Sequence, residues 1–138
     1  MINPGITLQD LTAMAKGNMV EHLGIEFTAI GPDFISAKMP VDKRTTQPLG
    51  LLHGGASVVL AETLGSIAAN CSVDNTKYYC VGLEINANHI RSVRSGFVIG
   101  TTKPFHIGKT TQVWEISIRD EQEHLVCISR ITMAVLAR

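Results

Sequence analysis

Hydrophobic and polar positions form two short patterns at the start of the chain. Between residues 7 and 23 apolar side chains recur at a loose helical spacing that Gly17 interrupts, which predicts one or two short helical turns. Two alternating stretches follow, residues 24–30 and 34–41, on either side of the turn signal Gly31-Pro32-Asp33. Because alternation with a period of two is typical of half-buried strands, we expect an early β-hairpin here.

A different pattern fills residues 54–71. This segment has no proline and a single charged residue, and apolar or small residues occupy every side of a helical wheel. As an α-helix it would be about 25 Å long. A helix that is apolar all round is normally buried, so this segment is predicted to be the central helix of the fold.

Strand-like patterns occupy the chain after residue 75. Four segments are rich in β-branched or alternating residues, namely 79–87, 96–105, 110–119 and 125–136. Gly108-Lys109 and residues 120–123 supply hairpin turns. A hairpin, one long buried helix and four further strands predict an α+β fold with an antiparallel sheet wrapped on the helix. The 138 residues fit one domain, residues 1–138.

Composition and charge narrow the class of protein. Hydrophobic residues make up 45% of the chain and charged residues 17%, which excludes a disordered chain. The 12 Lys and Arg balance the 12 Asp and Glu, so net charge favours neither nucleic acid nor an anionic membrane as a partner. The three cysteines lack metal-type spacing and fit reduced thiols, and the N-terminus lacks the build of a signal peptide. We therefore expect a cytoplasmic protein.

One carboxylate stands alone in the apolar segment. Between Arg44 and Asp74 the only charged side chain is Glu62. Burying an ionised carboxylate without partners is costly, so a fold that does so usually gains chemistry from it. The alternative is a structural carboxylate bonded to a backbone or basic group in the core. Glu62 is the leading candidate for a catalytic residue, either as a general base or as a nucleophile.

The segments around Glu62 supply further candidates. Ser66 lies one helical turn further along and could hold a water molecule for Glu62. At the start of the helix, Gly54 leaves backbone N–H groups open to a developing oxyanion. His53 precedes it, although a histidine at a loop–helix junction, taken alone, is more often structural. His53 and Glu62 lack a third ligand at a recognisable spacing, so we expect no metal and no cofactor.

A basic stretch lies in the strand-rich half. Residues 85–114 contain Arg91, Arg94, Lys103 and Lys109 but no Asp or Glu. Clustered cations of this kind bind phosphate oxygens, whereas lysines at a sheet edge also discourage strand pairing. On charge alone the two interpretations are equally supported.

The sequence reads QPLGLLHGGASVVLAE at residues 47–62 and GLEINANH at residues 82–89, and both strings resemble the hotdog-fold acyl-CoA thioesterases. Within that family the resemblance is greatest to the thioesterases that act on 1,4-dihydroxy-2-naphthoyl-CoA in menaquinone synthesis and to the proofreading thioesterases of enterobactin synthesis. It implies a hotdog fold, assembly into homodimers or homotetramers as dimers of dimers, and active sites at the dimer interface.

The resemblance also implies roles for residues of this chain. Glu62 would be the catalytic carboxylate and Gly54 the backbone donor to the thioester carbonyl, while Gln47 and His53 would assist from the opposite subunit. Ser66 would help to place the attacking water, and Ile67 occupies a position tied to the choice between CoA and carrier-protein substrates. The implied contacts to CoA are Gly82, His89, Ile90, Arg91, Ser92, His106, Ile107, Gly108, Lys109, Thr110 and Thr111.

Several functions remain open at this point. The first is hydrolysis of an aromatic or medium-chain acyl-CoA thioester, and a close variant is proofreading hydrolysis of a mis-acylated aryl carrier protein. The second is a non-catalytic acyl-CoA-binding module, because the same cleft can bind without turnover. The third is a dehydratase acting on a hydroxyacyl thioester, for which His53 is an imperfect match.

Overall fold

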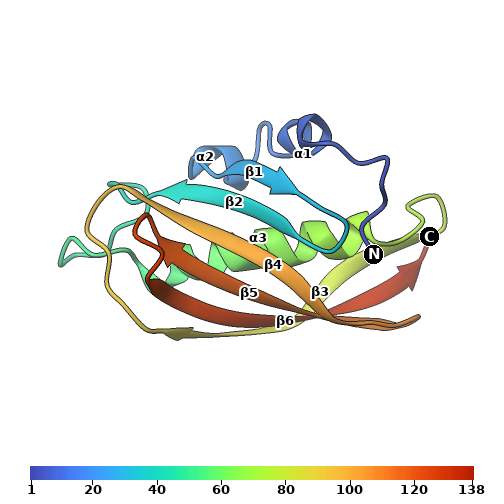
Figure 1. The fold of residues 1–138 in the computed structure, drawn as a ribbon. Helices are drawn as coiled ribbons and strands as arrows, with labels where there is room; N and C mark the ends of the chain where they lie inside the picture. Colours follow the sequence, from blue (N-terminus) through green and yellow to red (C-terminus); the bar gives the residue numbers. More distant parts are fainter.

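One antiparallel sheet wraps around a long helix in the computed structural model, which describes residues 1–138 (Figure 1). The elements in chain order are α1 (Leu8–Met14), α2 (Met19–His22), β1 (Glu26–Ile30), β2 (Ile35–Pro40), α3 (Gly54–Cys71), β3 (Tyr78–His89), β4 (Phe97–Ile107), β5 (Thr111–Asp120) and β6 (Leu125–Ala137). In space the strands follow the order β1-β2-β4-β5-β6-β3, and every neighbouring pair is antiparallel. The α+β prediction is confirmed.

The two short helices lie over β1 (Figure 1). α1 begins with a capping box, in which the Thr7 hydroxyl accepts a hydrogen bond from the Asp10 N–H and the Asp10 carboxylate accepts one from the Thr7 N–H. Asn18 caps α2 by accepting from the Val20 N–H. Leu11 of α1 is fully buried. Caps and packing together stabilise helices that are too short to form alone.

α3 lies against one face of the sheet and packs on β2, β3, β4, β5 and β6. Its Leu60 and Leu64 are fully buried. Glycines allow the backbones to come close: a Cβ at Gly65 would clash with the Ile131 side chain, and a Cβ at Gly100 would lie 2.6 Å from Cδ1 of Leu64. The helix is therefore held close to the strands at these two glycines.

The strands alternate between a face turned toward α3 and a face turned away. On β5, Trp114, Ile116 and Ile118 are fully buried, whereas the two residues between them, Glu115 and Ser117, are only partly buried. The Trp114 indole N–H donates to Oε1 of Gln112 at 2.8 Å, and Nε2 of Gln112 donates to the Ser72 hydroxyl at 2.9 Å. This buried polar chain ties the C-terminal end of α3 to β5.

β1 and β3 form the two edges of the sheet. β3 is 12 residues long and pairs with β6 on one side only, with a bulge between Gly82 and Glu84. Its other side is open, and the apolar side chains of Val81 and Leu83 are 38% and 62% exposed. An open, long edge with exposed apolar residues is a template for pairing with another chain.

The predicted elements all form, and the observed ends of the strands differ from the predicted ones by at most two residues. α3 has the predicted bounds. A curled antiparallel sheet around one helix is the arrangement that the hotdog resemblance implies. No helix combines the length and the hydropathy that crossing a membrane requires.

Candidate active site

His53 holds the start of α3. Its Nδ1 accepts a hydrogen bond from the Gly55 N–H at 2.8 Å, and its carbonyl accepts from the Ala56 and Ser57 N–H groups. A neutral imidazole that accepts at Nδ1 carries its proton on Nε2. The structure thus gives His53 the capping role of a junction histidine and leaves its Nε2–H as a donor.

A tight loop precedes His53. The Gln47 N–H donates to the Leu51 carbonyl at 2.8 Å, and the Gly50 N–H donates to the Gln47 carbonyl at 2.9 Å. Gly50 has a φ of 77°, in the left-handed region that favours glycine. The Gln47 side-chain oxygen accepts from the Leu49 N–H. The loop therefore fixes Gln47, a predicted site residue, close to the start of α3.

Gly54 is the first residue of α3 and lies against His89 of β3. A Cβ at Gly54 would lie 2.8 Å from Nε2 of His89, so a larger residue would displace the imidazole. The first N–H groups of a helix have no partner within the helix, and the helix dipole favours negative charge at that end. The Gly54 N–H is therefore suitable as a donor to an oxyanion.

A cleft of about 300 Å³ connects the loop, the start of α3 and the end of β3. Its lining includes six predicted site residues: Gln47, Gly54, His89, Ile90, Arg91 and Ser92. The remaining lining residues were not predicted: Leu51, Leu52, Ser57 and Val126. Nothing in a sequence separates such residues from ordinary core positions, because their types and spacing are those of any buried segment.

The Glu62 carboxylate lies further along α3 and faces β3. A Cβ at Gly82 would lie 2.8 Å from Oε1 of Glu62, so the carboxylate fills the space left by the absent side chain. None of the four ion pairs of the chain includes Glu62. Partial burial raises the pKa of Glu62 above its ordinary value, and no charged neighbour contributes to that shift. The alternative of a carboxylate paired with a basic group finds no support.

Ser66 and Ile67 follow Glu62 along α3. Ser66 lies one turn from Glu62 on the same side of the helix and is partly buried. Ile67 is partly buried and packs against the core. Both positions are compatible with the roles that the resemblance implies for them.

The remaining predicted CoA contacts lie at the opposite end of the sheet. The Thr110 carbonyl accepts from the Val135 N–H at 2.8 Å, and Val135 pairs with Cys80 near the start of β3. His89, in contrast, lies at the end of β3. These remaining contacts form the hairpin between β4 and β5, namely His106, Ile107, Gly108, Lys109, Thr110 and Thr111. One chain alone does not bring this hairpin to the cleft at Gly54.

The basic stretch is also divided. Arg91 and Arg94 lie in the loop between β3 and β4, Lys103 lies within β4, and Lys109 lies in the hairpin at the other end. The four cations therefore do not form one phosphate-binding cluster within a single chain. Only Arg91 lies at the cleft beside Gly54.

Gly54 and Glu62 are separated along α3. Eight residues of α-helix extend about 12 Å. A thioester carbonyl bound at the Gly54 N–H would therefore lie too far from Glu62 of the same chain, because reacting atoms must approach to about 3–3.5 Å. The chain therefore presents the two candidate groups apart: the Gly54 N–H in a cleft, and the partly buried Glu62 carboxylate beside the open edge.

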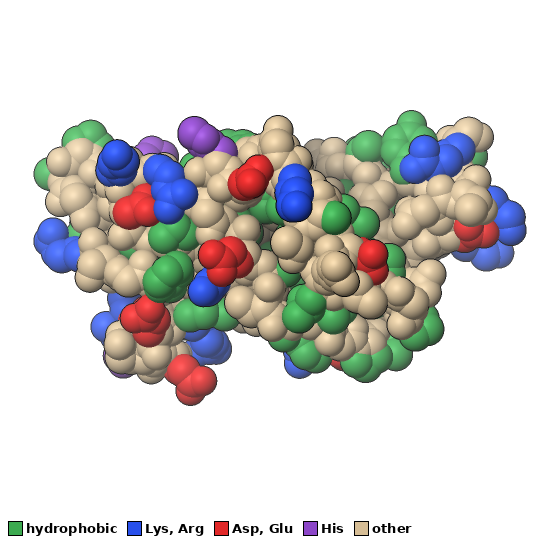
Figure 2. All heavy atoms as spheres, turned by 90° about the horizontal axis from the view of Figure 1, so that it is seen from above, with side chains coloured by type: hydrophobic (Ala, Val, Ile, Leu, Met, Phe, Trp, Pro, Cys, Tyr) green, Lys and Arg blue, Asp and Glu red, His purple; other side chains and the backbone are tan.

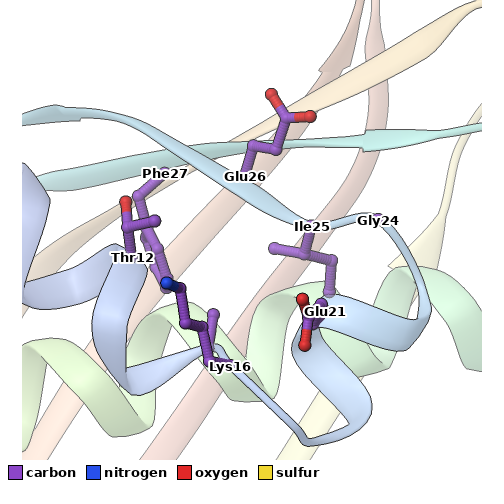
Figure 3. Close-up of a pocket in the computed structure, with 8 residues that line it drawn as sticks. Thr12, Lys16, Glu21, Gly24, Ile25, Glu26 and Phe27 are labelled. Carbon is purple, nitrogen blue, oxygen red and sulfur yellow. The ribbon is translucent and has the colours of Figure 1, made fainter.

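A second cavity, of about 380 Å³, lies between α1, α2 and β1 (Figure 3). Its carboxylates are used in structural contacts: Glu21 accepts from the Gly17 N–H at 2.6 Å, and Glu26, directed away from the cavity in Figure 3, pairs with Lys38 at 3.1 Å. On the face shown in Figure 2, acidic and basic side chains are interspersed. Neither the cavity nor this face presents a convergent set of reactive groups.

Comparisons with known proteins cover nearly the whole chain. Residues 49–127 match the family described as the thioesterase superfamily. The 1,4-dihydroxy-2-naphthoyl-CoA hydrolase of Escherichia coli is 56% identical over 131 residues, which are 95% of this chain and 96% of that protein. The proofreading thioesterase EntH of Cronobacter turicensis is 51% identical, with 95% of each chain covered.

Solved structures agree with the sequence matches. A thioesterase variant from Pseudomonas aeruginosa is similar with a TM-score of 0.97 and 48% identity, covering 99% of both chains. A thioesterase from Haemophilus influenzae has a TM-score of 0.95 and 48% identity, covering 99% of this chain and 94% of the other. The predicted hotdog fold is confirmed.

Proposed function

The chain belongs to the thioesterase superfamily, and on that premise we propose that it hydrolyses aromatic acyl-CoA thioesters, with 1,4-dihydroxy-2-naphthoyl-CoA as its physiological substrate. Thioester hydrolysis is the activity that the family and its named relatives indicate. The acyl group is proposed from the Escherichia coli relative, which is named for that substrate. A non-catalytic binding module and a dehydratase are less well supported, because these relatives are named as hydrolases.

Glu62 is proposed as the catalytic carboxylate. The observation that carries this role is its environment, because the carboxylate is unpaired, partly buried and turned toward the space above Gly82 at the open edge. A carboxylate whose pKa is raised by burial is a stronger base than one in water. We assign it the activation of water, with the Ser66 hydroxyl one turn away to position that water.

A second copy of the chain is proposed to complete the site. The β3 edge is open and carries exposed apolar residues, and two antiparallel β3 edges can pair about a two-fold axis. An axis near the middle of the segment from Gly82 to His89 would place the Gly54 and His89 of one copy opposite the Gly82 and Glu62 of the other. The same axis would bring the 106–111 hairpin of one copy toward the 89–92 segment of the other.

The proposed reaction follows from this arrangement. The thioester carbonyl oxygen accepts the Gly54 N–H, with the Gln47 amide and the His53 Nε2–H nearby to support it. Glu62 of the other copy takes a proton from water as the oxygen attacks the carbonyl carbon. The tetrahedral oxyanion then collapses, the carbon–sulfur bond breaks, and the leaving CoA sulfur receives the proton that Glu62 took from water, which restores the carboxylate. The products are the free acid and CoA.

The test is a thiol-release assay on 1,4-dihydroxy-2-naphthoyl-CoA and benzoyl-CoA. Glu62→Gln should lower kcat by about 10²–10⁴-fold, the usual contribution of general base catalysis. Glu26→Gln is the control, because Glu26 is an exposed carboxylate on the covered edge strand β1, where it pairs only with Lys38. Near wild-type kcat in a folded Glu62→Gln variant would refute the proposal. No free CoA from the wild-type protein on either substrate would refute it as well.

Proofreading of aryl carrier protein is the second candidate. It is favoured by the 51% identity to the EntH relative, which is named for proofreading. Ile67 lies on α3 between one and two turns beyond Glu62 and is a candidate for this preference. Comparison of kcat/KM for 1,4-dihydroxy-2-naphthoyl-CoA and for an aryl carrier-protein thioester decides between the two, and a tenfold ratio corresponds to about 1.4 kcal/mol.

A single domain and a cytoplasmic location are proposed with this function. One core cluster extends from Ile2 to Met133 and joins the helices to the sheet. The three cysteines are buried and unpaired, as expected of a protein kept in a reducing compartment.

A further inference from the structure

Asn70, near the C-terminal end of α3, bonds to both backbone groups of one residue of β3. Its Oδ1 accepts from the Cys80 N–H at 2.8 Å, and its Nδ2 donates to the Cys80 carbonyl at 3.0 Å. The same Nδ2 donates to the Ser66 carbonyl at 2.9 Å within α3. One side chain therefore joins the central helix to the edge strand through three hydrogen bonds.

These bonds are made on the unpaired edge of β3, opposite the edge that pairs with β6. Cys80 is aligned with Val135 of β6, but the Val135 N–H donates to the Thr110 carbonyl instead. In an antiparallel ladder the residues of a non-hydrogen-bonded pair direct their N–H and C=O groups away from each other. The Asn70 amide thus occupies the place that a neighbouring strand would take at Cys80.

The contact lies beside the proposed catalytic carboxylate. Glu62, Ser66 and Asn70 follow one another at intervals of four residues and share the side of α3 that faces β3. On β3, Gly82 is two residues beyond Cys80, so both turn the same face toward α3. Immediately after Gly82 the ladder to β6 is interrupted by the bulge. Pairing with β6 alone therefore fixes this part of β3 less firmly than a regular ladder would.

We propose that Asn70 is a positioning residue: by holding Cys80 against α3 it fixes the distance between Gly82 and the Glu62 carboxylate. The inference rests on the proposed role of Glu62. It has a further consequence for the edge, because Cys80 is closed to pairing and the part of β3 open to a second copy begins after it.

The test compares Asn70→Ala with a matched variant, Ser72→Ala. Ser72 also lies at the end of α3, but it binds Gln112 of β5 and takes no part in holding β3. Both variants should lower the melting temperature, since each leaves a polar partner unsatisfied. Only Asn70→Ala should lower kcat, by about tenfold or more, because small displacements of reacting groups are costly. Its KM should change by less than about twofold, since the Gly54 cleft is untouched.

Hydrogen exchange supplies an independent readout, since the Cys80 amide should lose protection in Asn70→Ala and keep it in Ser72→Ala. If Asn70→Ala does not fold, Asn70→Asp replaces it, because a carboxylate keeps the acceptor for the Cys80 N–H and loses the donor to the Cys80 carbonyl. Its kcat should fall by about threefold to tenfold. Wild-type kcat in a folded Asn70 variant, with Glu62→Gln inactive, would overturn this inference alone. An active Glu62→Gln would instead overturn the proposed function.

Discussion

The two edge strands of the sheet differ in what covers them. β1 is overlaid by α1 and α2, and the Ile25 N–H before it donates to the Val20 carbonyl of α2 at 3.0 Å (Figure 1). β3 has no such cover, and Leu83 on it is 62% exposed. The Glu62 carboxylate lies against β3, next to Gly82, and not against β1. The chain thus covers one edge with its own helices and leaves open the edge that lies next to its solitary carboxylate.

From this difference we expect the residues around β1 to serve the stability of the fold and the residues around β3 to serve its activity. The covered edge contains capped helices and buried apolar side chains, and its carboxylates Asp10, Glu21 and Glu26 are engaged in local contacts. The open edge contains a bulge, a glycine beside a carboxylate and exposed apolar residues. We therefore expect changes at β3 to act on catalysis and assembly, and changes near β1 to act on folding alone.

Leu83→Lys should have the largest effect. A lysine buried in a pair of β3 edges would be desolvated without a partner, so the dimer should dissociate and kcat should fall by about 100-fold or more. Sedimentation and the thiol-release assay measure both quantities. The control is Met19→Lys, which changes a similarly exposed apolar residue of α2, and it should alter neither. A dimeric, active Leu83→Lys variant would remove the distinction between the two edges.

Gly82→Ala should have a smaller effect. The new Cβ would lie 2.8 Å from Oε1 of Glu62, so the carboxylate must move, and kcat should fall by about ten- to 100-fold. Gly5→Ala is the matched control, because its Cβ would meet only ordinary contact at 3.5 Å. Equal kcat in the two variants would show that the space above Glu62 has no catalytic role.

Thr7→Ala tests the covered edge. Loss of the hydroxyl that accepts from the Asp10 N–H should lower the free energy of unfolding by about 1 kcal/mol, the usual value of an N-cap. Urea denaturation measures the loss. At temperatures well below melting kcat should equal that of the wild type, and a fall in kcat would mean that α1 contributes to the site.

The smallest effect should be that of Glu62→Gln on the pH dependence of the melting temperature. Because burial raises the pKa of Glu62, its ionised form is disfavoured in the folded state. The wild type should therefore lose stability as pH rises from the ordinary glutamate pKa of 4.5 to the raised value, and the loss should persist above it. Glu62→Gln removes this loss, so it should melt slightly above the wild type at pH 7 and together with it well below pH 4.5.

The same titration should set the acid limb of wild-type kcat, at a pH above 4.5. A limb at or below that value, or a Glu62→Gln variant that melts below the wild type at pH 7, would contradict the burial of this carboxylate.

Local pattern predicted the elements well for physical reasons. α3 combines length, small residues and a single charge, and no other structure suits such a segment, so both its ends and Glu62 could be identified. The strands alternate clearly because one face of the sheet packs on α3. Alternation shows which face a residue occupies but not which strand is its neighbour, and so the place of β3 at the far edge beside β6 was not predictable.

Site features that depend on this neighbour order were missed for the same reason. The fit of Glu62 above Gly82, the contact of Gly54 with His89 and the Asn70 bonds to Cys80 all join α3 to β3. A glycine within a strand pattern signals close approach of another group, so Gly82 did carry a clue. Asn70 carried none, because an asparagine near a helix end has many ordinary roles.

The central claim is that each active site combines Gly54 of one subunit with Glu62 of another. Complementation between two inactive variants tests it most directly. Glu62→Gln removes the carboxylate, and Gly54→Val fills the oxyanion position, where a Cβ would already lie 2.8 Å from His89. When the two chains are co-expressed with different tags, a site shared between subunits leaves one intact site in each mixed dimer, and purified mixed dimers should regain about half of the wild-type kcat. Mixed dimers as inactive as either parent would contradict the account.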